Sequence, residues 1–234
     1  MSHPNEPHEG TEGSRLNSLR AAVLGANDGI VSVSALILGV IGSGAGSAAI
    51  FTAGLASTIA GAVSMSLGEY VSVSAQRDTE RAQVEQERRE LAEDPEGEHL
   101  ELAGILEGYG VTKETAHTAA TEISGGNTLS AHLRLELGLD GDDLTSPWQA
   151  AGWSALSFLS GALLPLLSVF VAPRGNEALL VTAVTLVALS ITGFISAKLS
   201  RTSPVVSVAR LVIGGALGLA VTYGIGSLFG ISTG

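Results

Sequence analysis

The sequence has 234 residues, of which 45% are apolar and only 15% are charged, and its formal net charge at pH 7 is −11. Soluble domains usually carry about 25% charged residues, so this composition favours a protein embedded in a lipid bilayer. The negative charge argues against nucleic acid as a partner, because phosphate binding needs a basic surface. The absence of cysteine excludes disulfides, thiolate metal sites and iron–sulfur clusters.

Four long stretches without any charged side chain predict five membrane spans. These stretches are residues 29–68, 144–173, 178–197 and 211–234. A spanning helix needs about 20 apolar residues, so the first stretch must hold two spans, joined at the turn-prone segment 42–47. We therefore predict an all-α integral membrane protein, and a soluble bundle with buried helices is the less favoured alternative. The predicted spans are residues 19–42, 48–76, 148–172, 178–198 and 205–230.

The distribution of charge predicts the orientation and the domains. Residues 78–143 hold 17 Asp or Glu and 5 Lys or Arg, whereas the rest of the chain is nearly neutral. Lys and Arg gather before span 1, after span 2 and between spans 4 and 5, as in cytoplasmic loops. We expect the N-terminus and the acidic segment in the cytoplasm and the C-terminus outside. The predicted domains are a disordered N-terminus (1–18), spans 1 and 2 (19–76), a cytoplasmic helical metal-binding domain (77–146) and spans 3 to 5 (147–234).

The acidic segment is predicted to be helical. Residues 77–93 contain no Gly or Pro, so we expect span 2 to continue through them as one long helix. Asp94 and Pro95 end that helix, and further helices are expected over 96–109, 112–124 and 128–138. Glu96 and His99 have the Glu-x-x-His spacing of di-iron bundles, but the sequence has a single copy, so we expect no ferroxidase centre there. His117 is expected at the surface.

Metal-ligand side chains recur at helical spacing on three helices of the acidic segment. They are Glu80, Glu87 and Glu90 on the first, Glu98 and Glu101 on the second, and His132 and Glu136 on the last. Like charges at these spacings destabilise a helix unless something neutralises them, and a divalent cation does so. Carboxylates with imidazole and no sulfur suit Fe²⁺, Mn²⁺ or Zn²⁺ better than Cu⁺. The alternative is a solvated acidic face interleaved with arginines.

Two acidic residues lie inside the predicted spans. Asp28 follows Arg20 by eight residues in span 1, and Glu69 precedes Arg77 by eight residues in span 2, so both carboxylates are expected at one level of the membrane. Ionisable groups at this depth usually mark an ion path or a proton relay. Met65 lies one helical turn from Glu69 and offers a thioether, although packing is the alternative role for this residue. Structural roles for both acids, in capping, hydrogen bonding or snorkelling, are also open.

Several sequence strings resemble one known family. They are residues 24–32, LGANDGIVS; residues 64–74, SMSLGEYVSVS; residues 77–80, RDTE; and residues 147–151, PWQAA. Together they closely resemble the vacuolar iron transporter family over about residues 15–230. The short loops resemble those of bacterial members, which implies a location in the bacterial plasma membrane.

The resemblance implies a homodimer with five membrane helices per subunit and an ion path at the subunit interface, between the first two helices of each. It also implies that a cytoplasmic helical domain binds metal before transport, and that Fe²⁺, often with Mn²⁺, leaves the cytosol in exchange for protons. The path residues at matching positions are Asp28, Met65 and Glu69. The matching cytoplasmic ligands are Glu87, Glu90, Glu98, Glu101 and Glu136, with Glu80 on the same stripe. His132 and Leu133 stand where relatives have methionine, so this chain offers nitrogen in place of sulfur.

The predicted function is therefore a homodimeric, proton-coupled exporter of Fe²⁺, Mn²⁺ or both, with Zn²⁺ and Co²⁺ also open as substrates. The alternative is a membrane-anchored metal sensor or buffer without net transport. All five histidines lie outside the spans and no nucleophile–base pair is evident, so we expect no enzyme activity. The expected partners are divalent metal ions, protons, a second copy of the chain and the lipid bilayer, with no prosthetic group.

Overall fold

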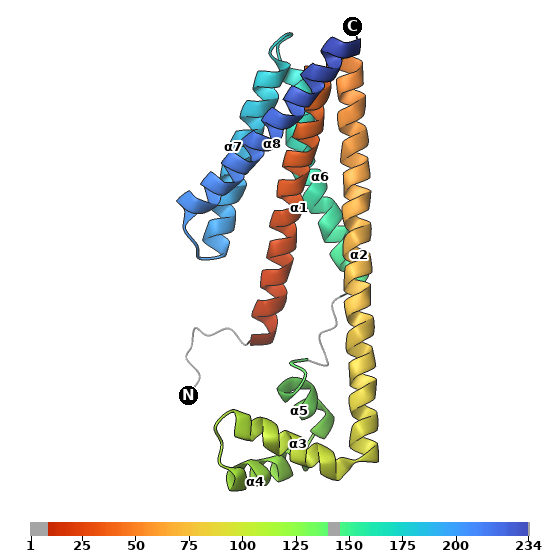
Figure 1. Ribbon diagram of the computed structural model, residues 1–234, viewed down its shortest axis with the longest axis vertical. Helices are drawn as coiled ribbons and strands as arrows, with labels where there is room; N and C mark the ends of the chain where they lie inside the picture. Colours follow the sequence, from red (N-terminus) through yellow and green to blue (C-terminus); the bar gives the residue numbers. More distant parts are fainter. Residues whose placement is uncertain (1–8, 140–145, 234) are drawn as a thin grey trace. The chain divides into compact units, whose positions relative to one another are not determined.

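The computed structural model describes residues 9–139 and 146–233, and every regular element within these ranges is an α-helix (Figure 1). These helices belong to two compact units. Unit 1 combines Met1–Tyr70 with Trp148–Gly234, and unit 2 is Val71–Pro147. The domain expected from the charge distribution, residues 77–146, falls within unit 2.

Unit 1 holds the helices that are long and apolar enough to cross a membrane. They are α1 (Glu9–Gly42), the first part of α2 (Ser47–Glu93), α6 (Pro147–Val171), α7 (Glu177–Leu199) and α8 (Pro204–Thr233). The prediction of an all-α protein with five spanning helices is confirmed. With 47 residues, α2 is more than twice as long as the ~20 residues that cross a bilayer. We treat its charged part beyond Arg77 as lying outside the membrane.

The start of α1 corrects one expectation. Residues 1–18 were expected to be disordered, but α1 begins at Glu9, although its apolar part begins only at Ala21. Once a helix is nucleated, each further residue joins it at little cost, so a polar segment can extend an apolar helix. Residues 1–8 lie outside the described part of the chain.

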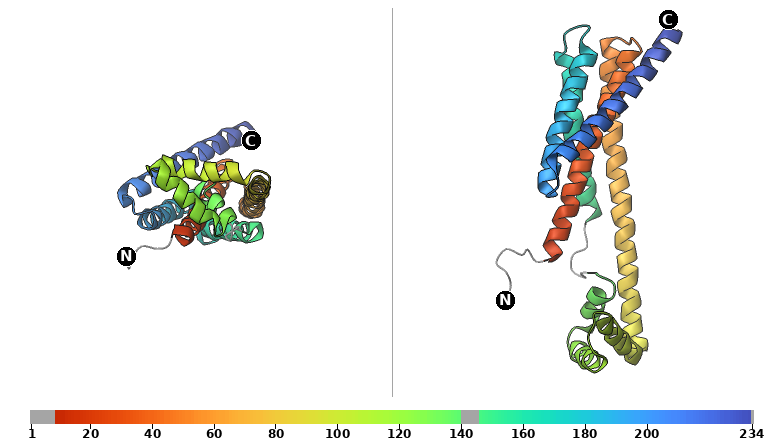
Figure 2. Two further views of the ribbon diagram at one scale, coloured as in Figure 1. Left: turned by 90° about the horizontal axis from the view of Figure 1, so that it is seen from below. Right: turned by 60° about the vertical axis from the view of Figure 1, so that its left-hand side comes forward.

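The core of unit 1 draws on all five of its helices. Figures 1 and 2 show α1, α7 and α8 packed along one another. The fully or almost fully buried residues at the centre are Val33, Ile37, Leu38, Ile50, Ala62, Phe158, Ala162, Val181 and Leu219. A buried hydrogen bond of 2.7 Å joins the hydroxyls of Ser34 and Thr185 and ties α1 to α7.

Glycines let α1 approach its neighbours very closely. A Cβ atom on Gly29 would lie 2.1 Å from the carbonyl oxygen of Phe158, and one on Gly161 would lie 2.1 Å from that of Ala26. Farther along α1, a Cβ on Gly226 of α8 would lie 1.9 Å from the carbonyl oxygen of Gly39. These contacts bring backbone against backbone, as small residues do in membrane helices.

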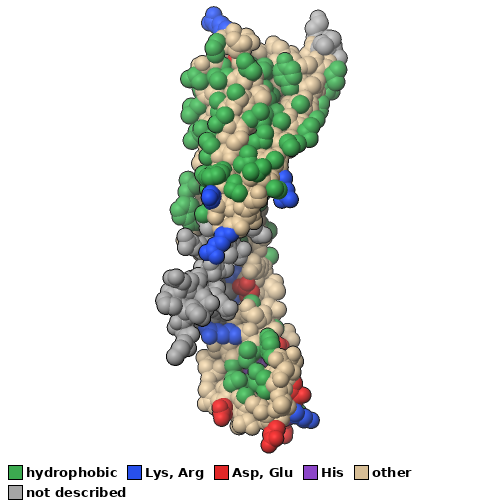
Figure 3. Space-filling view, turned by 90° about the vertical axis from the view of Figure 1, so that its left-hand side faces the viewer, with side chains coloured by type: hydrophobic (Ala, Val, Ile, Leu, Met, Phe, Trp, Pro, Cys, Tyr) green, Lys and Arg blue, Asp and Glu red, His purple; other side chains and the backbone are tan. Residues whose placement is uncertain are grey.

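The outer surface of unit 1 is strongly apolar. Large hydrophobic side chains remain exposed on it, among them Leu179, Val205, Ile213 and Leu228. Figure 3 shows hydrophobic side chains gathered over the face of unit 1 that is turned to the viewer. In water such a surface would aggregate, whereas in a bilayer it faces lipid tails of the same polarity.

Unit 2 is built from the last part of α2 and three short helices. These are α3 (Pro95–Gly108), α4 (Lys113–Ser124) and α5 (Thr128–Leu135). Each lies within a few residues of its predicted range. The last helix ends at Leu135 rather than at residue 138, because Gly138 has a φ of 65° and so leaves the right-handed helical region.

Candidate metal-binding site

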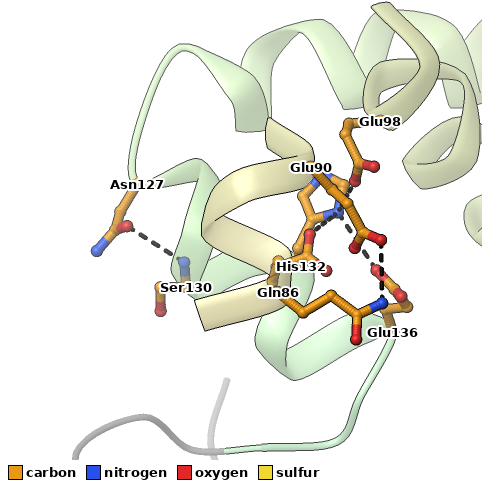
Figure 4. A network of polar contacts seen from close by, with 8 residues as sticks. Gln86, Glu90, Glu98, Asn127, Ser130, His132 and Glu136 are labelled. Carbon is orange, nitrogen blue, oxygen red and sulfur yellow. Dashed lines mark hydrogen bonds and ion pairs between the residues drawn. The ribbon is translucent and has the colours of Figure 1, made fainter. Parts of the chain in front are cut away.

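Four side chains from three helices of unit 2 converge on one point. Glu87 comes from α2, Glu98 from α3, and His132 and Glu136 from the end of α5. Each offers a ligand atom, and the four atoms all lie within 4.8 Å of one another. Figure 4 labels three of them and shows the carboxylates of Glu98 and Glu136 turned toward the ring of His132. We call these four residues the Glu/His cluster.

Local sequence signals place the ligands. Asp94 caps α3, because its carboxylate accepts a 2.9 Å hydrogen bond from the backbone N–H of Gly97. A Cβ on Gly97 would lie 2.3 Å from that carboxylate. Glycine at this position, one residue before Glu98, therefore leaves room for the Asp94 cap. Asn127 caps α5 in the same way, through the N–H of Ser130 at 3.2 Å (Figure 4). The two caps fix where the ligand-bearing helices begin.

The distances within the Glu/His cluster match those of a coordination shell. The Nδ1 atom of His132 lies 3.0 Å from Glu87 Oε1, 3.4 Å from Glu98 Oε2 and 3.5 Å from Glu136 Oε2. Ligands about 2.1 Å from a tetrahedral ion are about 3.4 Å from each other. A single N–H cannot donate to three carboxylates at once, and Nδ1 has no hydrogen-bond partner among the described residues. A shared cation would satisfy all four groups together.

Burial makes this group of like charges costly without a cation. The side chains of His132 and Glu87 are 0% and 2% exposed. Burial, followed by repulsion from Glu136, Glu98 and Glu90, raises the pKa of Glu87 to about 7. The pKa of Glu98 is also raised, first by burial and then by the charge of Glu101. A metal ion would remove this repulsion and keep the carboxylates ionised.

Two neighbouring arginines of α2 interact with Glu85 rather than with the Glu/His cluster. Arg88 pairs with Glu85 at 3.0 Å on the exposed side of α2, and Arg89 donates to the backbone oxygen of Glu85. The alternative of a solvated acidic face interleaved with arginines therefore describes Glu85 and its partners. It does not describe the buried residues Glu87 and Glu98.

The remaining predicted ligands lie outside the Glu/His cluster, at different distances from it. Glu90 accepts a 3.0 Å hydrogen bond from Gln86, and its carboxylate lies beside the cluster in Figure 4. Glu101 is exposed and adds negative charge next to Glu98. Glu80 lies apart from the Glu/His cluster, because it is two turns before Glu87 on α2, about 10 Å along the helix. Its carboxylate accepts a hydrogen bond from Gln76.

Unit 1 contains a second candidate site, a hollow of about 510 Å³ along α1 and α2. Asp28 and Met65 both line it. Asp28 is exposed on this side of unit 1, and within the described part of the chain it forms no ion pair. Phe158 of α6 forms part of the wall, and its ring lies over Gly61 of α2. The structure thus brings together two of the three predicted path residues.

The hollow also contains residues that the sequence reasoning missed and lacks one that it proposed. Ser32, Ser57 and Ser64 line it. The sequence spacing indicates part of this lining, because Ser57 and Ser64 are seven residues apart and therefore share one face of α2 with Met65. Glu69 is half-buried and does not line the hollow.

Comparison with known proteins gives a consistent result. Residues 19–227 match the VIT family. The chain is 37% identical over 224 residues to "Vacuolar iron transporter" of Acanthamoeba castellanii, covering 95% of this chain and 82% of that protein. It is 37% identical over 218 residues to "Vacuolar iron transporter homolog 1" of Oryza sativa subsp. japonica, covering 93% and 76%. It is 34% identical over 214 residues to "Vacuolar iron transporter homolog 2" of Arabidopsis thaliana, covering 91% and 85%.

Proposed function

The chain belongs to the VIT family, and on this premise we propose that it exports Fe²⁺, Mn²⁺ or both from the cytosol in exchange for protons. Its helices make it an integral membrane protein, and the names of its relatives support metal transport rather than enzyme activity. The observation that carries the proposal is the pairing of a buried Glu/His cluster in unit 2 with an acidic hollow in unit 1.

In the proposed mechanism, unit 2 collects metal on the cytosolic side. Three carboxylates and an imidazole suit Fe²⁺, Mn²⁺, Zn²⁺ and Co²⁺, because these ions accept oxygen and nitrogen donors. Glu90 and Glu101 surround the Glu/His cluster with further negative charge, which attracts cations to it. The excess of Lys and Arg on the same side of the predicted membrane supports the cytosolic placement of unit 2.

The proposed path runs through the hollow beside Asp28 and Met65. An exposed carboxylate at membrane depth is costly if lipid covers it. A second copy of the chain, packed against α1 and α2, would close the hollow and place two Asp28 side chains in one path. This argument supports a homodimer, in which carboxylate, thioether and serine hydroxyls from both subunits bind the passing ion. Glu69, in the following turn of α2, extends the path toward the cytosol.

Proton exchange follows from the chemistry of these ligands. A carboxylate binds metal only when it is deprotonated, so protons arriving from outside compete with the metal for Asp28. Metal release is then coupled to protonation, and an inward proton gradient drives export.

The rival function is a membrane-anchored metal sensor or buffer that uses the Glu/His cluster without net transport. Such a protein needs no acidic residue in its membrane helices. The presence of Asp28 in a lined hollow therefore favours transport.

Flux through proteoliposomes containing the full-length protein tests the proposal. Asp28→Ala should abolish Mn²⁺ influx while calorimetry still detects wild-type binding at the Glu/His cluster. Glu177→Ala is the matched control, because Glu177 is an acid at the start of α7 that does not line the Asp28 hollow, and it should leave influx unchanged. Normal transport by Asp28→Ala would show that the path is elsewhere.

A further inference from the structure

Two histidines of unit 2 face each other outside the Glu/His cluster. His99 on α3 and His117 on α4 have ring centroids 6.0 Å apart, with an angle of 37° between the ring planes. Both residues are half-buried. Among the described residues, neither ring has a hydrogen bond or an ion pair, so its nitrogens remain available as ligands. A surface role, as the sequence suggested for His117, does not account for this pairing.

The spacing of the rings suits one shared metal ion. A metal–nitrogen bond of about 2.0–2.1 Å places the ion about 3.2 Å from each ring centroid. The two centroids are then about 5–6.5 Å apart for bond angles at the ion between tetrahedral and linear. The observed 6.0 Å falls within this range, so the separation of the two rings allows one ion to bind both.

The helices that carry the two rings are held together by a core of their own. Figure 1 shows α3 and α4 as neighbours within unit 2. Leu102 and Ala103 of α3 pack against Ala116 and Ala120 of α4, and all four are at most 1% exposed. This packing fixes the two backbones from which the imidazoles project, so little conformational entropy is lost when an ion binds both.

We propose that His99 and His117 form a second metal site of unit 2, with two imidazole nitrogens and water completing the coordination of a late first-row divalent ion. Nitrogen donors favour Cu²⁺, Ni²⁺ and Zn²⁺ over Mn²⁺ and Fe²⁺, following the general order of affinities. The Glu/His cluster, with three carboxylates, discriminates less strongly between these two groups of ions. His99 directly follows Glu98, so one short helix carries ligands for both sites. The pair would hold competing late metals apart from the Glu/His cluster. Metal binding by the pair does not depend on transport.

Pulsed electron paramagnetic resonance with one equivalent of Cu²⁺ tests the site, because it counts coordinated imidazoles. The full-length protein is used with His3→Ala and His8→Ala, which removes the two histidines outside the described residues. Two imidazoles are expected, and they should persist in His132→Ala. Changing both His99 and His117 to Ala should remove them and weaken Cu²⁺ binding by about tenfold or more. An unchanged imidazole count and affinity in the double variant would overturn the proposal.

A second measurement separates metal binding from ring packing. Changing both residues to Phe keeps two packed rings but removes the nitrogens. With Zn²⁺ added to proteins that also carry His132→Ala, hydrogen exchange in α4, which holds no residue of the Glu/His cluster, should slow in the histidine protein and stay unchanged in the Phe variant, while metal-free exchange is similar in both. If Zn²⁺ protects both proteins equally, the histidines only pack and the proposal is wrong. Neither outcome bears on Mn²⁺ flux, so the transport proposal is tested separately.

Discussion

Replacing Glu87 with glutamine tests whether the Glu/His cluster holds carboxylates together against their own repulsion. Burial and the charges of Glu136, Glu98 and Glu90 raise the pKa of Glu87 from 4.5 to about 7. A carboxyl whose pKa is higher in the folded than in the unfolded state stabilises the fold fully only below its unfolded pKa. That contribution is lost as the pH rises through the folded value. Metal-free unit 2 should therefore become less stable between about pH 5 and pH 8.

The size of the effect follows from the shift. A pKa raised from 4.5 to about 7 is worth about 3 kcal/mol in total, of which about 2 kcal/mol is lost between pH 5.5 and pH 8.5. Glutamine has the same size as glutamate but does not ionise. Glu87→Gln should remove the contribution of Glu87 to this pH dependence, leaving that of Glu98, and make metal-free unit 2 more stable than the wild type at about pH 8.5.

Hydrogen exchange in the full-length protein measures this stability locally. Opening free energies of α3 and α5 are followed with a chelator present, after correction for the pH dependence of intrinsic exchange. Mn²⁺ should restore the stability of the wild type at high pH but not that of Glu87→Gln, because the variant has lost a ligand. An opening free energy that is independent of pH in the wild type, or equally dependent on pH in the variant, would refute the reasoning.

Three further predictions follow from the same structure. His132→Ala should weaken Mn²⁺ and Zn²⁺ binding to unit 2 by about 10- to 100-fold in calorimetry, because it leaves three buried carboxylates without their central nitrogen. Gly161→Ala should destabilise unit 1 by about 1–3 kcal/mol in thermal unfolding in detergent, whereas Gly218→Ala should not, because no atom lies within 4 Å of a Cβ placed at Gly218. A double-mutant cycle of Ser34→Ala and Thr185→Val should give a coupling energy of about 0.5–1.5 kcal/mol, and no coupling would mean that their hydrogen bond is not maintained in the membrane.

The helices were predictable because their signals are local. Charge-free stretches set the spans, and Asp94-Pro95 and Gly125-Gly126 set the helix boundaries within unit 2. The start of α1 at Glu9 was not predictable from apolarity, since a polar segment joins a helix that the following span has already nucleated. The end of α5 was missed because the left-handed conformation at Gly138 depends on the turn that follows.

The candidate site was only partly predictable, because helical spacing identifies a face but not its partners. Glu80 shares a stripe with Glu87, yet the ligands from α3 and α5 converge on Glu87, so Glu80 remains outside the cluster. The i,i+4 spacing of His132 and Glu136 predicts that both lie on one face of a helix, and His132 Nδ1 lies 3.5 Å from Glu136 Oε2. The pairing of His99 with His117 depends on the packing of α3 on α4, which no spacing within one helix reveals.

The most direct test of the central claim is simultaneous measurement of metal and proton flux. Wild-type protein is reconstituted into liposomes with a pH-sensitive dye inside, and Fe²⁺ or Mn²⁺ is added outside under an imposed proton gradient. The proposed exchanger predicts metal influx accompanied by proton efflux, which Asp28→Ala should abolish. Metal that binds to the protein without any flux, under every gradient, would contradict transport and favour a membrane-anchored sensor or buffer.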